Sequence, residues 1–177
     1  MERRDALAKD DLQNSAKLRD ALYDALEDER TGMLGVTGTR DHMQPMTHFL
    51  DREEGCLWFI SSNRTDLVRH LEGGARDAHF TVSSGKGQLY ACMSGPLAVA
   101  DDPEKLAELW SPMASMWFDG GKDDPEITLL RMPLHEAAVW LNEAGTLRFG
   151  MEMVRGALSE HDPEVGEHGV IDLRSAA

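Results

Sequence analysis

The stretch LWFISSNRTDLVRHLEGG (57–74) joins a strand-like segment to a helix-like segment through a short polar loop. Residues 57–60 are apolar and predict a buried strand. The helix after the loop ends at Gly73 and Gly74, either of which can take the left-handed backbone position that follows a helix. Asn63 is a natural N-cap, and Asp66 follows three residues later, as in a capping box with Asp in place of Glu. Helix capping alone can therefore explain the loop.

The same loop also has the chemistry of an anion-binding site. Hydroxyl groups and a guanidinium come together at the start of the helix, from Ser61, Ser62, Arg64 and Thr65. Free N–H groups, hydroxyls and a positive charge are what a terminal phosphate needs. Asp66 opposes such a site, because a carboxylate in the first turn competes for the same N–H groups. The local sequence leaves capping and anion binding about equally supported.

Composition and charge limit the classes of function. The chain has 177 residues, 41% of them hydrophobic, which fits one domain with a substantial core. No apolar run approaches the ~18 residues of a membrane span, and the charged start MERRDALAKDDLQN lacks the apolar segment of a secretory signal. The net charge of −14, without a dense basic stripe, argues against nucleic acid as a partner. Because Cys56 and Cys92 make no disulfide framework, we expect a cytoplasmic protein.

Short apolar or alternating segments with short turns predict a mainly β fold. The expected strands are 33–38, 44–50, 56–61, 78–84, 88–100, 126–133 and 136–142, with helices at 11–29, after the polar loop, and at 101–110. About six antiparallel strands would form a closed or nearly closed barrel, which leaves no exposed edges. We expect an N-terminal helical segment (1–30) on the barrel, a barrel domain (31–144) and a C-terminal helical extension (145–177), as one structural domain. Gly95-Pro96 inside a strand suggests a bulge or a bend.

Several common sites have no support in the sequence. The seven histidines show no ligand spacing and lie near no cysteine pair, so we expect no metal site. The motifs of serine hydrolases, dinucleotide-binding folds and P-loop proteins are absent. Trp117 stands in a glycine-rich loop, where an aromatic side chain can serve as core, lid or subunit contact.

The ordered blocks of the chain resemble a known family. They are MLGV, QPM, LWFIS, the hydroxyl cluster, LYACMSGPLAVADD, LAELWSPMASMWFDGGKDDP and ITLLRMPLHEAAVWL, over about residues 18–142. In order and spacing they are similar to the general stress proteins related to pyridoxamine 5′-phosphate oxidase, the FMN-binding split-barrel family. The resemblance implies a six-stranded antiparallel Greek-key split barrel with peripheral helices. It also implies a homodimer with flavin mononucleotide (FMN) at the subunit interface.

The resemblance assigns candidate cofactor contacts block by block. Those beside the flavin ring are Gln44, Pro45, Met46 and Thr47. Those at the flavin phosphate are Ser61, Ser62, Arg64 and Thr65. Trp117 lies where the partner subunit can approach the ring, and Lys86 and Tyr90 are weaker candidates from neighbouring strands.

The chain departs from the family pattern where positive charge is expected. Gln44 replaces a frequent Arg, and Thr65-Asp66-Leu67 replaces Ser-x-Lys. Since each charge-assisted bond contributes roughly 1.5 to 3 kcal/mol, losing one or two would weaken FMN binding ~10- to 1,000-fold. Basic residues for a pyridoxine phosphate substrate are also lacking, so we do not expect pyridoxamine 5′-phosphate oxidase activity.

Three functional hypotheses remain open. The first is a flavin-dependent oxidoreductase with a small-molecule redox partner, in which FMN or another flavin carries the chemistry. The second is a non-catalytic flavin-binding or flavin-sensing module. The third is a barrel protein that has lost the cofactor. The sequence identifies no catalytic acid or base.

Overall fold

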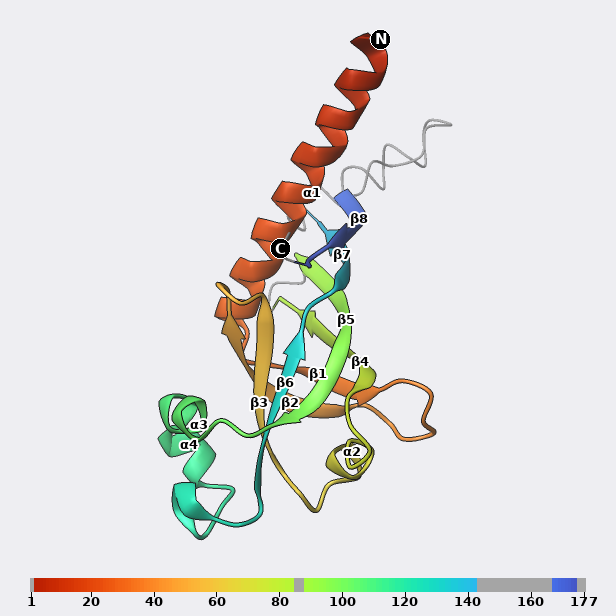
Figure 1. Ribbon diagram of the computed structural model, residues 1–177. Coiled ribbons are helices and arrows are strands. Elements are labelled where there is room, and N and C mark those ends of the chain that lie inside the picture. Colours follow the sequence, from red (N-terminus) through yellow and green to blue (C-terminus); the bar gives the residue numbers. More distant parts are fainter. Residues whose placement is uncertain (1, 85–87, 143–166, 175–177) are drawn as a thin grey trace, which may run out of the picture.

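The computed structural model of the chain describes residues 2–84, 88–142 and 167–174. It is a mainly β protein built around a six-stranded antiparallel barrel (Figure 1). The barrel strands are β1 (Thr31–Val36), β2 (Gln44–Asp51), β3 (Cys56–Ser62), β4 (Arg76–Ser83), β5 (Leu89–Ala100) and β6 (Ile127–Pro133). They pair in the order β1-β2-β3-β6-β5-β4, and β4 closes the barrel by pairing with β1. The expected six-stranded split barrel is confirmed.

Two further strands extend the sheet from β5, outside the barrel. β7 (Glu136–Leu141) pairs with the first half of β5, and β8 (Glu167–Asp172) pairs antiparallel with β7. The sequence did not predict β8 as a strand. Residues 145–166 of the expected C-terminal helical extension lie outside the described residues. In the described parts of the chain, no helix has both the length and the apolarity to cross a membrane.

Helix α1 (Glu2–Asp28) lies against the barrel with its C-terminal half (Figure 1). Its buried face carries Leu18, Leu22, Tyr23, Ala25 and Leu26, which recur at the three- and four-residue spacing of an amphipathic helix. The buried ring of His48 bonds through Nε2 to the Leu26 carbonyl at 2.8 Å. The helix is thereby attached to β2, the strand that leads into the site described below.

The barrel core follows from the alternation of side chains along each strand. In β4, for example, Ala78, Phe80 and Val82 are buried while their neighbours are not. Phe80 meets Phe59 edge to face, with ring centroids 5.3 Å apart, an arrangement that aromatic pairs favour.

Gly95 marks the place where β5 changes partner. Ser94 pairs with β7, whereas Ala98 pairs with β6. The register of β5 with β4 runs without interruption through Gly95. Of the bulge or bend expected here, a bulge against β4 is therefore absent, and the strand passes from the sheet of β7 to that of β6. A Cβ at Gly95 would lie 1.9 Å from the carbonyl oxygen of Pro133, so a side chain at this position cannot fit without movement of the backbone.

The helix after β3 is shorter than expected and is capped differently. α2 (Asp66–Arg69) has Thr65 as its N-cap, and the Thr65 hydroxyl accepts the Val68 N–H at 3.3 Å. The expected cap at Asn63 is wrong. Pairing of β3 with β6 continues to Ser62, and the Asn63 backbone N–H still bonds to Glu126, so Asn63 belongs to the end of the strand. Gly74 has φ +110° and closes the turn, as expected.

Candidate functional site

A cavity of about 730 Å³ lies between strands β2 and β3 and the segment around α4 (Pro112–Ser115). Figure 1 shows the segment that contains α3 (Pro103–Leu109) and α4 beside β3. The cavity is lined by Arg30, Gln44, Pro45, Met46, Thr47, Phe49, Ile60, Ser61, Ser62, Thr65, Ser111, Pro112, Ala114, Trp117 and Phe118. Pockets of this size commonly hold small molecules and cofactors.

The strand β2 forms one wall of the cavity. Pro45, Thr47 and Phe49 alternate along it with Met46, which packs on the barrel core, and His48, which is buried. This alternation gives most of the strand one face toward the barrel and one toward the cavity, and at the start of the strand Gln44 and Met46 line the cavity as well. The Arg30 guanidinium lies over the Phe49 ring, 5.5 Å from its centroid, a cation–π contact.

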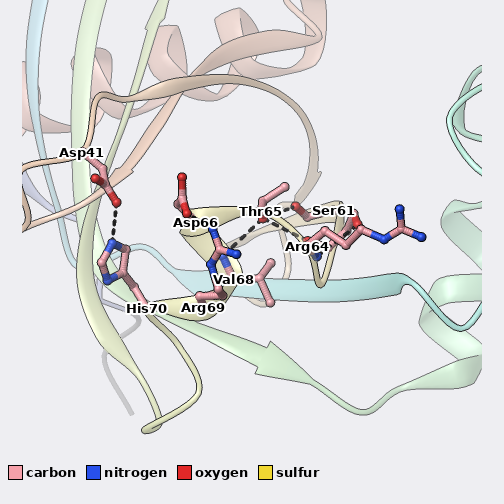
Figure 2. A network of polar contacts seen from close by, with 9 residues as sticks. Asp41, Ser61, Arg64, Thr65, Asp66, Val68, Arg69 and His70 are labelled. Atoms are coloured by element: carbon pink, nitrogen blue, oxygen red, sulfur yellow. Dashed lines mark hydrogen bonds and ion pairs between the residues drawn. The ribbon is translucent and has the colours of Figure 1, made fainter.

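The polar end of the cavity is made by three hydroxyls at the end of β3. Thr65 donates its O–H to the Ser62 carbonyl at 2.9 Å and accepts the Val68 N–H. Ser62 accepts the Arg64 N–H at 3.2 Å through Oγ, and Ser61 Oγ lies 3.5 Å from Thr65 Oγ1 (Figure 2). Each hydroxyl has one proton to donate. The Thr65 proton goes to the Ser62 carbonyl, so Ser61 is the donor in its contact with Thr65. Of the three hydroxyls, Ser62 can donate to a ligand directly, and Ser61 can do so by giving up its bond to Thr65.

The charged side chains of this loop are paired with one another or with neighbours. Arg64 is an ion-pair partner of Glu126, its side chain is 74% exposed, and it does not line the cavity. Asp66 forms an ion pair with Arg69, which raises the pKa of that guanidinium through their hydrogen bond. Figure 2 shows Arg64 extending away from this second pair. The loop therefore presents hydroxyls to the cavity without a free cation.

The opposite wall comes from α4 and the loop that follows it. Trp117 lines the cavity yet is 80% exposed, so it stands at the rim. Phe118 lies deeper and packs near Trp110, with ring centroids 6.1 Å apart. The Asp124 carboxylate accepts the Gly120 N–H at 3.0 Å and the Glu126 N–H at 2.9 Å, and these bonds hold the glycine-rich loop together.

The structure brings most of the predicted residues together. Gln44, Pro45, Met46, Thr47, Ser61, Ser62, Thr65 and Trp117 line the same cavity. Arg64 does not line it, and Lys86 lies outside the described residues. Tyr90 lies instead in a second groove of about 520 Å³, with Met33, Cys92 and Trp140 on the sheet of β1, β4, β5 and β7.

Several residues that line the cavity were not predicted from the sequence. Phe49 follows Pro45 and Thr47 on the same face of β2, so the alternation of the strand could have identified it. Arg30 lies between α1 and β1, where no periodic pattern places a side chain. Ser111, Pro112, Ala114 and Phe118 come from a short irregular segment whose fold depends on distant contacts.

A second polar cluster lies at the other end of β3. Potential ligand atoms of Asp51, Glu54 and Cys56 lie within 4.8 Å of one another. The two carboxylates are already paired, Asp51 with Lys105 at 3.3 Å and Glu54 with Arg131 at 3.0 Å. Burial raises the pKa of the Cys56 thiol, which disfavours the thiolate that binds metals. The cluster is explained by ion pairing.

Comparison with known proteins agrees with this architecture. The family model described as pyridoxamine 5′-phosphate oxidase like matches residues 17–164. The chain is similar to the structure of a provisionally named general stress protein 26 from Jannaschia sp. CCS1, with 36% identity and a TM-score of 0.75 over 89% of this chain and 99% of that chain. It is also similar to the general stress FMN/FAD binding protein from Xanthomonas citri, with 37% identity and a TM-score of 0.67 over 73% of this chain and 92% of that chain. No curated protein matches the chain at a significant level.

Proposed function

The chain belongs to the pyridoxamine 5′-phosphate oxidase like family, and we propose that it is a general stress-type protein whose β2–β3 cavity binds a flavin, most simply FMN. The observation that carries the proposal is the meeting of eight predicted contact residues in one cavity: Gln44, Pro45, Met46, Thr47, Ser61, Ser62, Thr65 and Trp117. The relative from Xanthomonas citri is named for FMN/FAD binding, which supports the same cofactor class.

The residues present fit a flavin in shape and polarity. The cavity joins apolar and aromatic walls, from Phe49, Ile60 and Phe118, to a polar end. A flavin likewise joins a planar aromatic ring to a polar chain. In the proposed arrangement the β2 wall from Gln44 to Thr47 supports the ring, and Trp117 covers it from the rim. The hydroxyls of Ser61 and Ser62 donate to the polar chain.

When bound, the flavin supplies hydride or electron transfer at its ring. The protein holds the ring against β2 and excludes water from its apolar wall. We propose an oxidoreductase role on this basis, with a small-molecule redox partner. No described side chain lining the cavity is a carboxylate or a histidine, and we assign no general acid or base.

We further propose a homodimer, because one outer face of the sheet carries exposed large apolar side chains. Met33, Tyr90, Trp140 and Val170 are 39%, 54%, 51% and 65% exposed. They lie on β1, β5, β7 and β8, and β4 separates β1 from β5 in this sheet. Soluble monomers rarely expose large contiguous apolar patches. Sedimentation equilibrium should report a dimer for the wild type and a monomer for Trp140→Glu; a monomeric wild type would refute this part of the proposal.

The cysteines accord with the proposed cytoplasmic location. Cys56 and Cys92 are free thiols, and Cys56 is fully buried. A reducing compartment preserves such thiols.

The test of flavin binding is direct. Purified protein should carry visible flavin absorbance, or should quench the fluorescence of added FMN. Bleaching by a reduced nicotinamide, followed by reoxidation with an electron acceptor, would support the oxidoreductase over a passive flavin-binding module. Absence of binding would favour the third hypothesis, a barrel that has lost its cofactor. The third hypothesis is included because Arg64, which was expected at the flavin phosphate, pairs with Glu126 instead.

A further inference from the structure

Arg30 is the one cation that lines the β2–β3 cavity in the described part of the chain. It lies at the junction of α1 and β1, and its backbone carbonyl accepts the His48 N–H at 3.2 Å. Its guanidinium is placed over the Phe49 ring. None of the lining residues is acidic, so the charge of Arg30 is not neutralised within the cavity.

Most other cations of the described chain are neutralised. Seven lysine or arginine side chains pair with carboxylates: Lys17, Arg52, Arg64, Arg69, Lys105, Arg131 and Arg174. Arg30 makes no ion pair within residues 2–84, 88–142 and 167–174. In a chain of net charge −14, an arginine that faces a cavity and remains without a carboxylate is available to a ligand.

Arg30 is exposed, so its guanidinium is hydrated at the edge of the cavity, and a neutral molecule placed against it would remove part of that water without replacing its hydrogen bonds. Burying a charge without a partner is costly, whereas a guanidinium that meets an anionic oxygen forms strong, often bidentate hydrogen bonds. We propose that Arg30 is a specificity-determining residue that recognises an anionic oxygen group of a ligand in this cavity. The inference rests on the proposed function in taking the β2–β3 cavity as the ligand site.

Arg30 and the hydroxyls occupy different parts of the cavity. Arg30 lies beside His48, which pairs with Phe59 of β3. Ser61 and Ser62 follow Phe59 by two and three residues, which places them roughly 7 to 10 Å further along the strand.

The anionic group that Arg30 would recognise has two sources, the phosphate of FMN or the carboxylate of a second, acidic substrate. Both present oxygens that match a guanidinium.

Ligand titrations of matched variants distinguish these sources. The protein would be titrated with FMN, with riboflavin, which lacks the phosphate, and with benzoate, by tryptophan fluorescence. The variants are Arg30→Gln and, as the control, Arg76→Gln, which removes an exposed arginine that does not line the cavity. Thermal unfolding of each variant would verify that the fold is retained.

If phosphate is the source, Arg30→Gln should weaken FMN binding about 10- to 100-fold and leave riboflavin binding unchanged. If a substrate carboxylate is the source, both flavins should bind normally and benzoate binding to the flavin-loaded protein should weaken by a similar factor. Arg76→Gln should bind all three ligands like the wild type. Arg30→Lys should retain part of the affinity for whichever anionic ligand, FMN or benzoate, Arg30→Gln binds more weakly.

The proposal is overturned if Arg30→Gln binds all three ligands like the wild type, or if it loses affinity for neutral riboflavin as much as for FMN. If the wild type binds no flavin, the proposed function fails, but the inference about Arg30 is still decided. Benzoate would then be titrated into the flavin-free protein, and equal binding to wild type and Arg30→Gln, or no binding to either, would refute it.

Discussion

Replacing Thr65 by Val tests whether the loop 61–65 mainly caps a helix or mainly binds an anion. Valine has nearly the same shape but no hydroxyl, so the variant loses the cap to Val68 and the bond to the Ser62 carbonyl. A cap contributes about 1 kcal/mol and a second hydrogen bond about 0.5 to 1.5 kcal/mol. The free energy of unfolding should therefore fall by about 2 kcal/mol, which for a chain of this size lowers Tm by about 4 to 8 °C.

Urea unfolding followed by circular dichroism measures this change, and FMN titration is the second measurement. Because the Thr65 proton is already donated to Ser62, FMN affinity should change less than about threefold, well below the effect of losing a charge-assisted bond. Thr65→Ser keeps the hydroxyl and should restore stability. The reasoning is refuted if Thr65→Val unfolds like the wild type while its FMN affinity falls tenfold or more.

Three other changes follow from the same structure. Gly95→Ala should lower the free energy of unfolding in urea by about 1 to 3 kcal/mol, because the alanine Cβ would clash with the Pro133 carbonyl. Unchanged stability would contradict this, since it would show that the backbone there shifts at little cost. Burial lowers the pKa of His48 from its ordinary 6.5, so the unfolded state binds the proton more readily. Stability should be complete above about pH 6.5 and fall below it, and His48→Gln should flatten that slope. Arg64→Gln should leave FMN affinity within about twofold, because its partner is Glu126 rather than the cavity.

The fold was largely predictable because its signals are local. In β2, the alternation of His48 and Leu50 with Thr47 and Phe49 distinguishes a core face from a cavity face within a few residues. The short turns predicted antiparallel neighbours. The cap of α2 was not predictable in the same way, because the end of β3 is set by its pairing with β6, far along the chain.

The residues of the candidate site that lie along a strand could be predicted from the sequence. Those whose position depends on ion pairs with distant residues could not. Gln44 to Thr47 line the cavity because β2 runs through it. Arg64 stands among hydroxyls in the sequence, but Glu126 takes its charge in the folded chain. Arg30 has no pattern around it, and its place at the cavity, over the Phe49 ring, is visible only in the folded chain.

The central claim is that a flavin occupies the cavity between β2, β3 and α4. FMN fluorescence titration of the wild type and of Ala114→Trp tests it most directly, because Ala114 lines the cavity from α4, outside the barrel core. The wild type should bind with a Kd on the order of micromolar or tighter, and the bulky side chain should weaken binding at least ~10-fold by occupying the flavin's space. A wild type that does not bind FMN, or an Ala114→Trp variant that binds it equally well, would contradict the claim.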